Sequence, residues 1–338
     1  MRLRGIPTHV LVCPDKFKGS FSAGQVAAAL VRGLAASGQP AESLPVADGG
    51  EGTLRALTHA LALERVPVTV SDPLGRPVAA EFGLAPDGVA VVEMALASGL
   101  ALLEPGELDP LAASTRGTGE LIAAAISAGA REVHVAVGGS ATTDGGEGAV
   151  QALRAAGGLG GAKLNVLCDV RTSFGDAARV FAPQKGADAE AVAELSARLG
   201  RQAAGYPRNP LGVPMTGAAG GLAGGLWAWF DARLVAGAAF VLDALGYDAR
   251  MRAARAVVAG EGRLDRQSLA GKALAEVATR ARQAGVPCHA VVGRNALDRF
   301  DARILDLQLV LEASTLAQIE AAGVELAQRL RWEHDRAG

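Results

Sequence analysis

Apolar and polar residues follow two patterns that alternate along the chain. Short runs of β-branched and other apolar residues, such as THVLVC at 8–13 and VHVAVGG at 133–139, alternate with Ala- and Leu-rich segments of helical character. A glycine-containing loop separates the two, as in ARAVVAGEG at 254–262. This repeated order of strand, loop and helix predicts an α/β protein with largely parallel sheets.

One stretch departs from this pattern. Residues 65–95 (RVPVTVSDPLGRPVAAEFGLAPDGVAVVEMA) hold three β-type segments separated by turns rich in Pro and Gly, with no helical segment between them. Consecutive strands of this kind form an antiparallel meander. We therefore expect a second domain to begin here, inserted after the first strands and helices of the chain.

Composition limits the classes of protein to consider. The chain has 338 residues, of which 50% are hydrophobic and 20% are charged, and its formal net charge is -2. These values are typical of a globular protein with one large or two ordinary domains, and they show no basic excess for nucleic-acid binding. The most apolar later stretch, 217–230, is too short and too rich in glycine to span a membrane. We expect a cytoplasmic protein that acts on small molecules.

The sequence DGGEG occurs twice, at 48–52 and at 144–148. In both copies the aspartate follows an apolar strand, the glycines allow a close approach of backbone to ligand, and a helix begins with free N–H groups. The pattern is typical of a cradle for phosphate or carboxylate. The alternative is a tight turn in which the aspartate caps the helix. Because the flanking sequences differ, a duplicated fold is not expected.

Three further loops have the same character. Residues 138–146 (GGSATTDGG) place hydroxyl groups between glycines, residues 216–225 (TGAAGGLAGG) are nearly all small, and residues 260–272 (GEGRLDRQSLAGK) carry several charges. Glycine-rich loops at strand ends are where open α/β sheets bind ligands. The chain has no Walker A sequence, no GxGxxG fingerprint and no GxSxG elbow, so a nucleotide would need another class of loop.

Lysines and the acidic residues at strand ends are the candidates for chemistry. Only five of the 33 basic residues are lysine, and four of these stand at glycine-flanked turns: Lys16, Lys18, Lys185 and Lys272. Lysine offers a compact charge for a phosphate oxygen. The carboxylates at strand ends, which could hold Mg²⁺ or accept a hydroxyl proton, are Asp15, Asp48, Glu51, Asp144, Asp169 and Asp265. For Asp169, a metal ligand and a helix cap are both open.

These motifs, taken in order, closely resemble the type 1 glycerate kinase family. The resemblance covers nearly the whole chain and rests on PDKFKGSFSA, PVADGGEGT, VVEMALASGLALL, STRGTGELI, GGSATTDGG, VFAPQKGA, GAAGGLAGGL and GEGRLDRQSLAGK. It implies ATP- and Mg²⁺-dependent phosphorylation of D-glycerate, with 2-phosphoglycerate as the product. It also implies a flavodoxin-like parallel-sheet domain formed by both chain ends, 1–68 and 251–338, with a mixed α/β domain, 69–250, inserted between them.

On this basis we assign a role to each candidate residue. The catalytic candidates are Lys18, Asp48, Asp265 and Lys272, with Asp48 as the base. The candidates for binding glycerate are Asp15, Lys16, Ser20, Gly49, Gly50 and Glu51. The candidates for binding ATP are Gly138, Gly139, Ser140, Thr142, Asp144, Gly220, Gly221 and Glu261. Asp169 is the candidate ligand of Mg²⁺.

Departures from the family pattern leave an alternative function open. Lys16 stands where the family usually has serine, and the segment after Asp169 also differs. The alternative is a catalytically silent relative that binds a sugar acid or a nucleotide as a sensor. For the active enzyme, we expect the DGGEG, DKFKGS and GEGRLD loops to converge on one cleft between domains. We expect a monomer or homodimer with no nucleic-acid or membrane partner.

Overall fold

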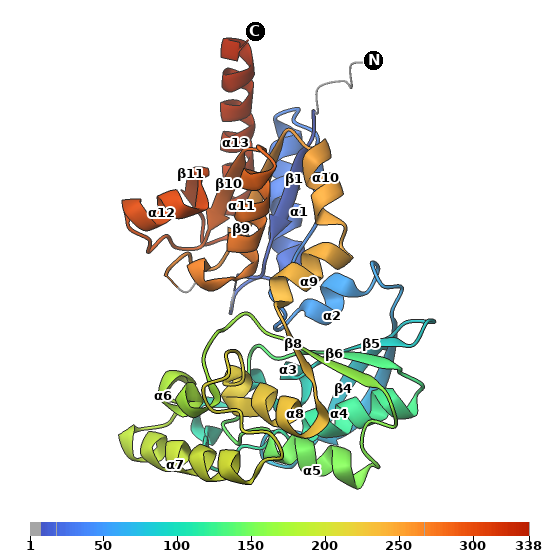
Figure 1. The fold of residues 1–338 in the computed structure, drawn as a ribbon. Coiled ribbons are helices and arrows are strands. Elements are labelled where there is room, and N and C mark those ends of the chain that lie inside the picture. The colour runs from blue at the N-terminus through green and yellow to red at the C-terminus, as the bar shows by residue number, and fades with distance from the viewer. Residues whose placement is uncertain (1–7, 18, 267, 338) are drawn as a thin grey trace. The chain divides into compact units, whose positions relative to one another are not determined.

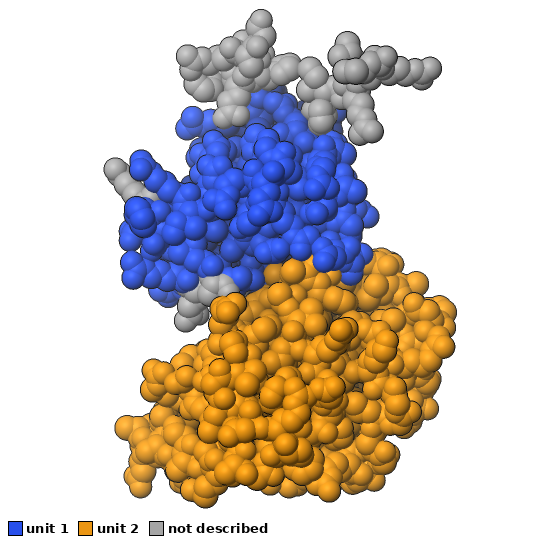
Figure 2. All heavy atoms as spheres, in the orientation of Figure 1, with its two compact units in different colours: residues 1–48, 241–338 blue, residues 49–240 orange. Residues whose placement is uncertain are grey.

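The computed structural model describes residues 8–17, 19–266 and 268–337 (Figure 1). The chain divides into two compact units, coloured in Figure 2: unit 1 consists of residues 1–48 and 241–338, and unit 2 of residues 49–240. These limits differ from the predicted boundaries at 68/69 and 250/251. The first predicted boundary falls inside strand β3 (Glu64–Ser71), which pairs along its whole length with β4 (Pro77–Leu84) of unit 2.

Unit 1 is built on a five-stranded sheet in which every pairing is parallel. Its strands are β1 (Val10–Pro14), β2 (Ala41–Ser43), β9 (Ala256–Glu261), β10 (Cys288–Val292) and β11 (Leu307–Glu312). The order across the sheet is β11-β10-β9-β1-β2. Counted within the unit, this is the flavodoxin-like order 2-1-3-4-5, which confirms the predicted fold of the domain formed by both chain ends.

Helices connect these parallel strands and cover the sheet (Figure 1). The helices of unit 1 are α1 (Ala23–Ala36), α10 (Tyr247–Ala253), α11 (Ala273–Gln283), α12 (Arg299–Leu305) and α13 (Leu316–Ala337), and α9 (Gly237–Ala244) leads into it from unit 2. All residues of β1, β9 and β10 are buried, which explains why the sequence shows them as continuous apolar runs. Ser22 caps α1, within a capping box completed by Gln25.

Unit 2 contains a six-stranded mixed sheet in the order β3-β4-β5-β6-β7-β8. Strands β3, β4 and β5 (Val89–Glu93) form the predicted antiparallel meander. The pairings from β5 through β6 (Glu132–Ala136) and β7 (Lys163–Leu167) to β8 (Arg233–Val235) are parallel. Its helices are α2 (Thr53–Leu57), α3 (Ala95–Ser98), α4 (Arg116–Ser127), α5 (Glu147–Ala155), α6 (Ala177–Phe181), α7 (Ala189–Gly205) and α8 (Leu222–Phe230).

A fully apolar core lies under each sheet. In unit 2 the inner residues of the parallel strands, among them Val92, Val135 and Val166, pack with α4 and are completely buried. In unit 1, α1 and α13 pack on the sheet through residues such as Leu30 and Leu326. Among the described residues, no helix is both long and apolar enough to cross a membrane.

The contact between α1 and α13 generates a stability prediction. A Cβ atom on Gly33 of α1 would lie 1.9 Å from the carbonyl oxygen of Glu320 in α13, whereas a Cβ on Gly24 of α1 would meet nothing within 4 Å. Helix propensity favours alanine at both positions by up to about 1 kcal/mol. At Gly33 the backbone collision outweighs this gain, so we expect Gly33→Ala to lower the free energy of unfolding by about 1–3 kcal/mol.

The measurement is urea unfolding of both variants and the parent protein. Gly24→Ala is the matched control, and we expect it to leave the unfolding midpoint unchanged or raise it. If Gly33→Ala proved as stable as Gly24→Ala, the close packing of the two helices at this glycine would be disproved.

Candidate active site

Two acidic residues lie side by side at the carboxyl edge of the sheet of unit 1. Pro14 of β1 pairs with Gly260 of β9, and the backbone N–H of Asp15 donates to the Gly260 carbonyl at 2.8 Å. Asp15 and Glu261 follow one residue beyond this pair, each on its own strand. They are 8% and 6% exposed. The parallel register therefore brings two buried carboxyl groups to the same edge.

Burial and the charges of neighbouring carboxylates make both groups weak acids. Burial raises the pKa of Asp15 to about 7, and the charge of Asp48 adds to the effect, while the Lys16 ammonium and backbone N–H oppose it. Burial likewise raises the pKa of Glu261 to about 7, against the opposing influence of the Ser268 hydroxyl and the Lys272 ammonium. Perturbed carboxyl groups clustered at a strand edge are typical of functional sites.

Two lysines compensate this negative charge. The Lys16 Nζ lies 3.9 Å from the Asp48 Oδ1, and the Lys272 Nζ lies 3.8 Å from the Glu261 Oε2. The Asp48 side chain is 26% exposed, so a small ligand can reach it more readily than it can reach Asp15. Unit 1 thus brings together Asp15, Lys16, Asp48, Glu261 and Lys272.

Two other predicted residues of unit 1, Asp265 and Ser20, take less central positions. Asp265 forms an ion pair with Arg263 of its own loop at 3.1 Å, and both line a shallow surface groove. Ser20 is exposed on a tight turn in which Phe17 and Phe21 exchange backbone hydrogen bonds. Lys18 lies outside the described residues.

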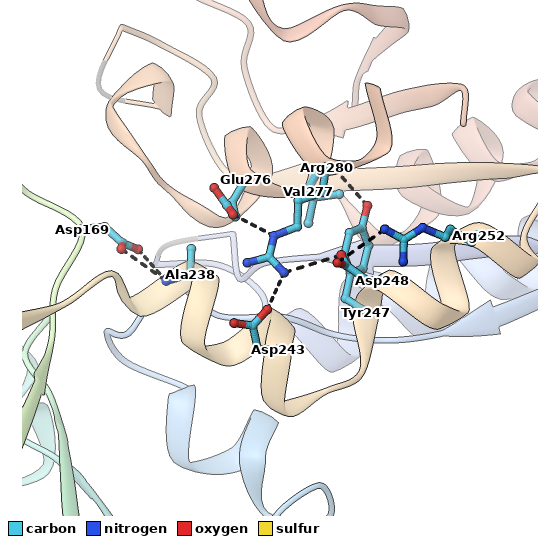
Figure 3. A network of polar contacts seen from close by, with 9 residues as sticks. All are labelled: Asp169, Ala238, Asp243, Tyr247, Asp248, Arg252, Glu276, Val277 and Arg280. Atoms are coloured by element: carbon cyan, nitrogen blue, oxygen red, sulfur yellow. Dashed lines mark hydrogen bonds and ion pairs between the residues drawn. The ribbon is translucent and has the colours of Figure 1, made fainter. Parts of the chain in front are cut away.

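An ion-pair network holds the helix that begins after Lys272 (Figure 3). Arg280 of α11, whose side chain is 15% exposed, contacts Glu276 at 2.7 Å and Asp243 at 2.5 Å, and Asp248 of α10 at 3.5 Å. The Tyr247 hydroxyl donates to the Val277 carbonyl at 2.9 Å. This network fixes α11 against α10 and so supports the position of Lys272 beside Glu261.

In unit 2 the glycines of the first DGGEG copy pack against the segment that follows β6. The backbone N–H of Val137 donates to the Gly49 carbonyl at 2.9 Å, and a Cβ on Gly138 would lie 2.5 Å from the Gly50 Cα. A Cβ on Gly49 would lie 2.8 Å from the Cα of Gly237. No side chain fits at these contacts. Glycine is therefore what allows residues 49–51 and 138–140 to lie together at the carboxyl end of β6.

The N-termini of the two following helices are occupied by protein side chains. The Glu93 carboxylate accepts from the backbone N–H of Gly52 at 2.9 Å and of Leu54 at 3.2 Å, at the start of α2. The Asp144 carboxylate accepts from Gly146 at 3.0 Å and Gly148 at 3.2 Å, and from the backbone and hydroxyl of Thr115 at 2.8 Å each. The expectation that these amides are available to a ligand is wrong.

Asp144 and Glu93 therefore act as helix caps. For Asp144 the structure favours the alternative of a capping acid over contact with a ligand, because its carboxylate is enclosed by its own loop. Glu93 was not predicted. Its position as the last residue of the buried strand VAVVE, a place where a carboxylate needs partners, is the signal that could have identified it.

The loops predicted to bind ATP also meet in unit 2, with different degrees of exposure. The Gly145 backbone N–H donates to the Gly220 carbonyl at 3.0 Å, and a Cβ on Gly220 would lie 2.0 Å from the Thr142 carbonyl oxygen. Thr142, Gly220 and Gly221 are buried, whereas Gly139 is exposed and Ser140 is partly exposed. Only the start of the 138–146 loop is therefore accessible to a nucleotide.

Asp169 follows β7 and contacts the start of α9 (Figure 3). Its Oδ1 accepts from the backbone N–H of Gly237 at 2.7 Å, and its Oδ2 from that of Ala238 at 3.0 Å. This is the geometry of a helix cap, the alternative that the sequence left open. In the part of the chain that the structure describes, no group of three or more His, Cys, Asp or Glu residues is arranged to hold a metal ion.

Comparisons with known proteins agree with one another. The family model described as the glycerate kinase family matches residues 10–158 and 154–329. A glycerate kinase of Halalkalibacterium halodurans is 39% identical, over 84% of this chain and 85% of its own. The glycerate 2-kinase of Escherichia coli K12 is 38% identical, over 84% of each chain. A crystal structure from Salmonella typhimurium LT2, assigned as glycerate kinase 2, superimposes with a TM-score of 0.79 at 32% identity, covering 97% of this chain and 99% of its own.

The raised pKa values of Asp15 and Glu261 generate a prediction about stability and pH. Both groups hold their protons more tightly in the folded protein, with pKa values of about 7, than in the unfolded chain. Between about pH 4 and pH 7 the unfolded state binds fewer protons, so the free energy of unfolding falls as the pH rises. Well above pH 7 both groups are ionised in the folded and the unfolded protein, so the free energy of unfolding falls no further on their account.

We therefore expect Asp15→Asn and Glu261→Gln to raise Tm at pH 8, by roughly 2–4 °C for each kcal/mol recovered. The gain should shrink at pH 5 and vanish near pH 4. Scanning calorimetry at the three pH values measures it. A lower Tm for both variants at pH 8 would show that the two carboxylates stabilise the fold.

Proposed function

The chain belongs to the glycerate kinase family, and from this membership and the charge cluster of unit 1 we propose that it phosphorylates D-glycerate with ATP as donor, giving 2-phosphoglycerate. The observation that supports this most is the grouping of Asp15, Lys16, Asp48, Glu261 and Lys272 at one sheet edge. A silent sensor has no use for buried carboxylates that weaken its fold. ATP consumption with and without D-glycerate distinguishes the two functions.

The residues of the first DGGEG and DKFKGS loops bind the acceptor in this proposal. Lys16 and Lys272 supply positive charge for the carboxylate of glycerate or for phosphate oxygens. Asp15, Ser20 and Glu51 provide hydrogen-bonding groups, and Gly49 and Gly50 let the ligand approach the backbone. Glu261, assigned from sequence to the nucleotide, acts with Asp15 instead, because the two carboxyl groups share one edge and the charge of Glu261 raises the pKa of Asp15.

Asp48 accepts the proton of the attacking hydroxyl. The hydroxyl oxygen forms a bond to the γ-phosphorus, the bond from that phosphorus to the oxygen of ADP breaks, and the hydroxyl proton passes to the Asp48 carboxylate. Lys18 and Lys272 offset the negative charge of the transferring group. Asp48 suits this role because it is the most exposed of the three neighbouring carboxylates and stands directly before the glycine loop.

The accessible start of the 138–146 loop binds the phosphates of ATP. Gly138, Gly139 and Ser140 contact the nucleotide in this proposal, since they are the exposed or partly exposed members of the loop. The buried candidates stabilise the conformation of the loop and do not contact the nucleotide: Thr142, Asp144, Gly220 and Gly221. Asp265 remains a catalytic candidate because it belongs to the GEGRLD motif. Its negative charge is partly offset by the ion pair with Arg263.

The Asp169 carboxylate fits one ligand of Mg²⁺. The ion usually binds through one or two carboxylates, substrate phosphates and water rather than in a cage of protein side chains. A carboxylate oxygen that accepts a hydrogen bond can also coordinate a metal ion, so the contacts with Gly237 and Ala238 allow Asp169 to be both cap and ligand. When bound, Mg²⁺ neutralises charge on the phosphate oxygens.

The base is tested by Asp48→Asn. We expect kcat to fall by roughly 10²–10⁴-fold, the usual contribution of a general base, while the affinity for ATP is retained. Steady-state kinetics and ATP titration measure the two effects. Asp231→Asn is the matched control, because the Asp231 side chain is 90% exposed and its ion pair is with Arg208, which is not a candidate residue. Near-normal kcat for Asp48→Asn would exclude it as the base and leave Asp15 and Asp265 to be tested.

The metal ligand is tested by Asp169→Asn. We expect the Mg²⁺ concentration for half-maximal rate to rise, because the variant loses the charge that attracts the ion. Weakening of the helix cap should also lower the free energy of unfolding by about 0.5–2 kcal/mol, the amount typical of a lost cap, and Tm should fall with it. A lower Tm with an unchanged Mg²⁺ dependence would show that Asp169 is a helix cap alone.

A further inference from the structure

Lys185 is a buried lysine to which the proposed mechanism assigns no role. It ends the short 3₁₀ helix Pro183–Lys185 between α6 and α7, and it is 1% exposed. Its Nζ donates to the carbonyl oxygen of Thr142 at 2.5 Å. Asp144, whose carboxylate is already engaged by Thr115, Gly146 and Gly148, is the charged group that acts on it. The ammonium group therefore lies in the interior beside the loop predicted to bind ATP.

A buried ammonium of this kind does not serve stability. Burial lowers the pKa of Lys185 to about 7, against the opposing charge of Asp144, which means that the charged form is disfavoured in its surroundings. An apolar side chain of the same length would avoid this cost of desolvation. The charge and the hydrogen bond must therefore contribute something other than folding energy.

Lys185 belongs to a row of side chains that bind consecutive carbonyl groups of the loop. Arg198 of α7 donates to the Thr143 carbonyl at 2.8 Å, Gln202 of α7 to the Asp144 carbonyl at 3.1 Å, and the Tyr206 hydroxyl to the Gly145 carbonyl at 3.0 Å. Together with the bond from Lys185 to Thr142, side chains within residues 185–206 bind four successive carbonyl groups of the loop. In a planar trans peptide the next N–H points the opposite way, so the row sets the direction of the loop's amides as well.

The Thr142 carbonyl is also where two glycine loops touch. A Cβ on Gly220 would lie 2.0 Å from this oxygen, so the 216–225 loop rests directly on the atom that Lys185 binds. Ser140, the last accessible residue of the loop, is two residues away. A shift of the Thr142 peptide would therefore move the Gly138–Ser140 segment.

We propose that Lys185 is a positioning residue for the phosphoryl donor: it orients the Gly138–Ser140 segment through the Thr142 carbonyl and adds positive charge behind a bound triphosphate. This inference rests on the proposed function, in which that segment receives the phosphates of ATP. Arg198 adds a second positive charge from the same side. The pair favours a polyanion at the loop without touching it.

The experiment compares Lys185→Met with Lys185→Gln and with Lys163→Met. Methionine keeps the length of the chain and removes both charge and hydrogen bond, whereas glutamine can still donate to Thr142 but carries no charge. Lys163 is an exposed lysine at the start of β7 and is the matched control. For each variant the KM for ATP, the KM for D-glycerate, the Kd for ATP without turnover, and Tm are measured.

We expect Lys185→Met to raise the Kd and KM for ATP by roughly tenfold or more, the scale of a lost charge-assisted hydrogen bond. The KM for D-glycerate and Tm should stay the same, or Tm should rise. A smaller effect of Lys185→Gln would identify the hydrogen bond as the larger contribution, and an equal effect would identify the charge. A fall in Tm with equal losses for both substrates would overturn the proposal, because it is the result of a purely structural role.

Ser140→Ala separates failure of this inference from failure of the proposed site. If Ser140→Ala raises the Kd for ATP and Lys185→Met does not, the loop binds ATP and the role of Lys185 is disproved. If neither variant changes the Kd for ATP, the nucleotide binds elsewhere and the inference falls with the proposed site.

Discussion

Close contact between glycine backbones is the constraint on which the candidate site of unit 2 depends. Gly50 against Gly138, Gly49 against Gly237 and Gly220 against the Thr142 carbonyl all leave no room for a Cβ atom. These contacts join loops that lie far apart in the sequence, among them the segments that follow the parallel strands β6 and β8. Because the glycines occupy so little space, the accessible surface at Gly138 and Gly139 is formed by backbone, and Ser140 is the residue of this segment that has a side chain.

The two DGGEG copies show how one sequence serves two purposes. At the second copy, Asp144 caps its own helix and is completed by Thr115, so its carboxylate is committed to the fold. At the first copy, Glu93 from a neighbouring strand caps the helix instead. Asp48 is not needed for the cap and lies beside Lys16, partly exposed. The difference comes from the partner that each copy meets in space.

Three buried ionisable groups lie at positions to which we assign function. Asp15, Glu261 and Lys185 are each more than nine-tenths buried and each has its pKa displaced toward the neutral form by burial. Such groups weaken a fold, and proteins retain them where activity requires them. The surrounding parallel sheets, with wholly buried central strands, provide the stability that makes this arrangement possible.

The sequence by itself determined the α/β class, the meander from β3 to β5, the cap of α1 and the family, because these depend on local hydrophobic period, turn residues and motif order. It also located the chemistry at strand ends. It could not decide which DGGEG aspartate is enclosed, that Glu93 and Asp169 cap helices, that the domain boundary precedes β3, or that Lys185 is buried. Those features depend on which strands become neighbours and which carbonyls meet a donor across long sequence separations. Only the tertiary structure creates these contacts, since the residues involved carry no local signal of their partners.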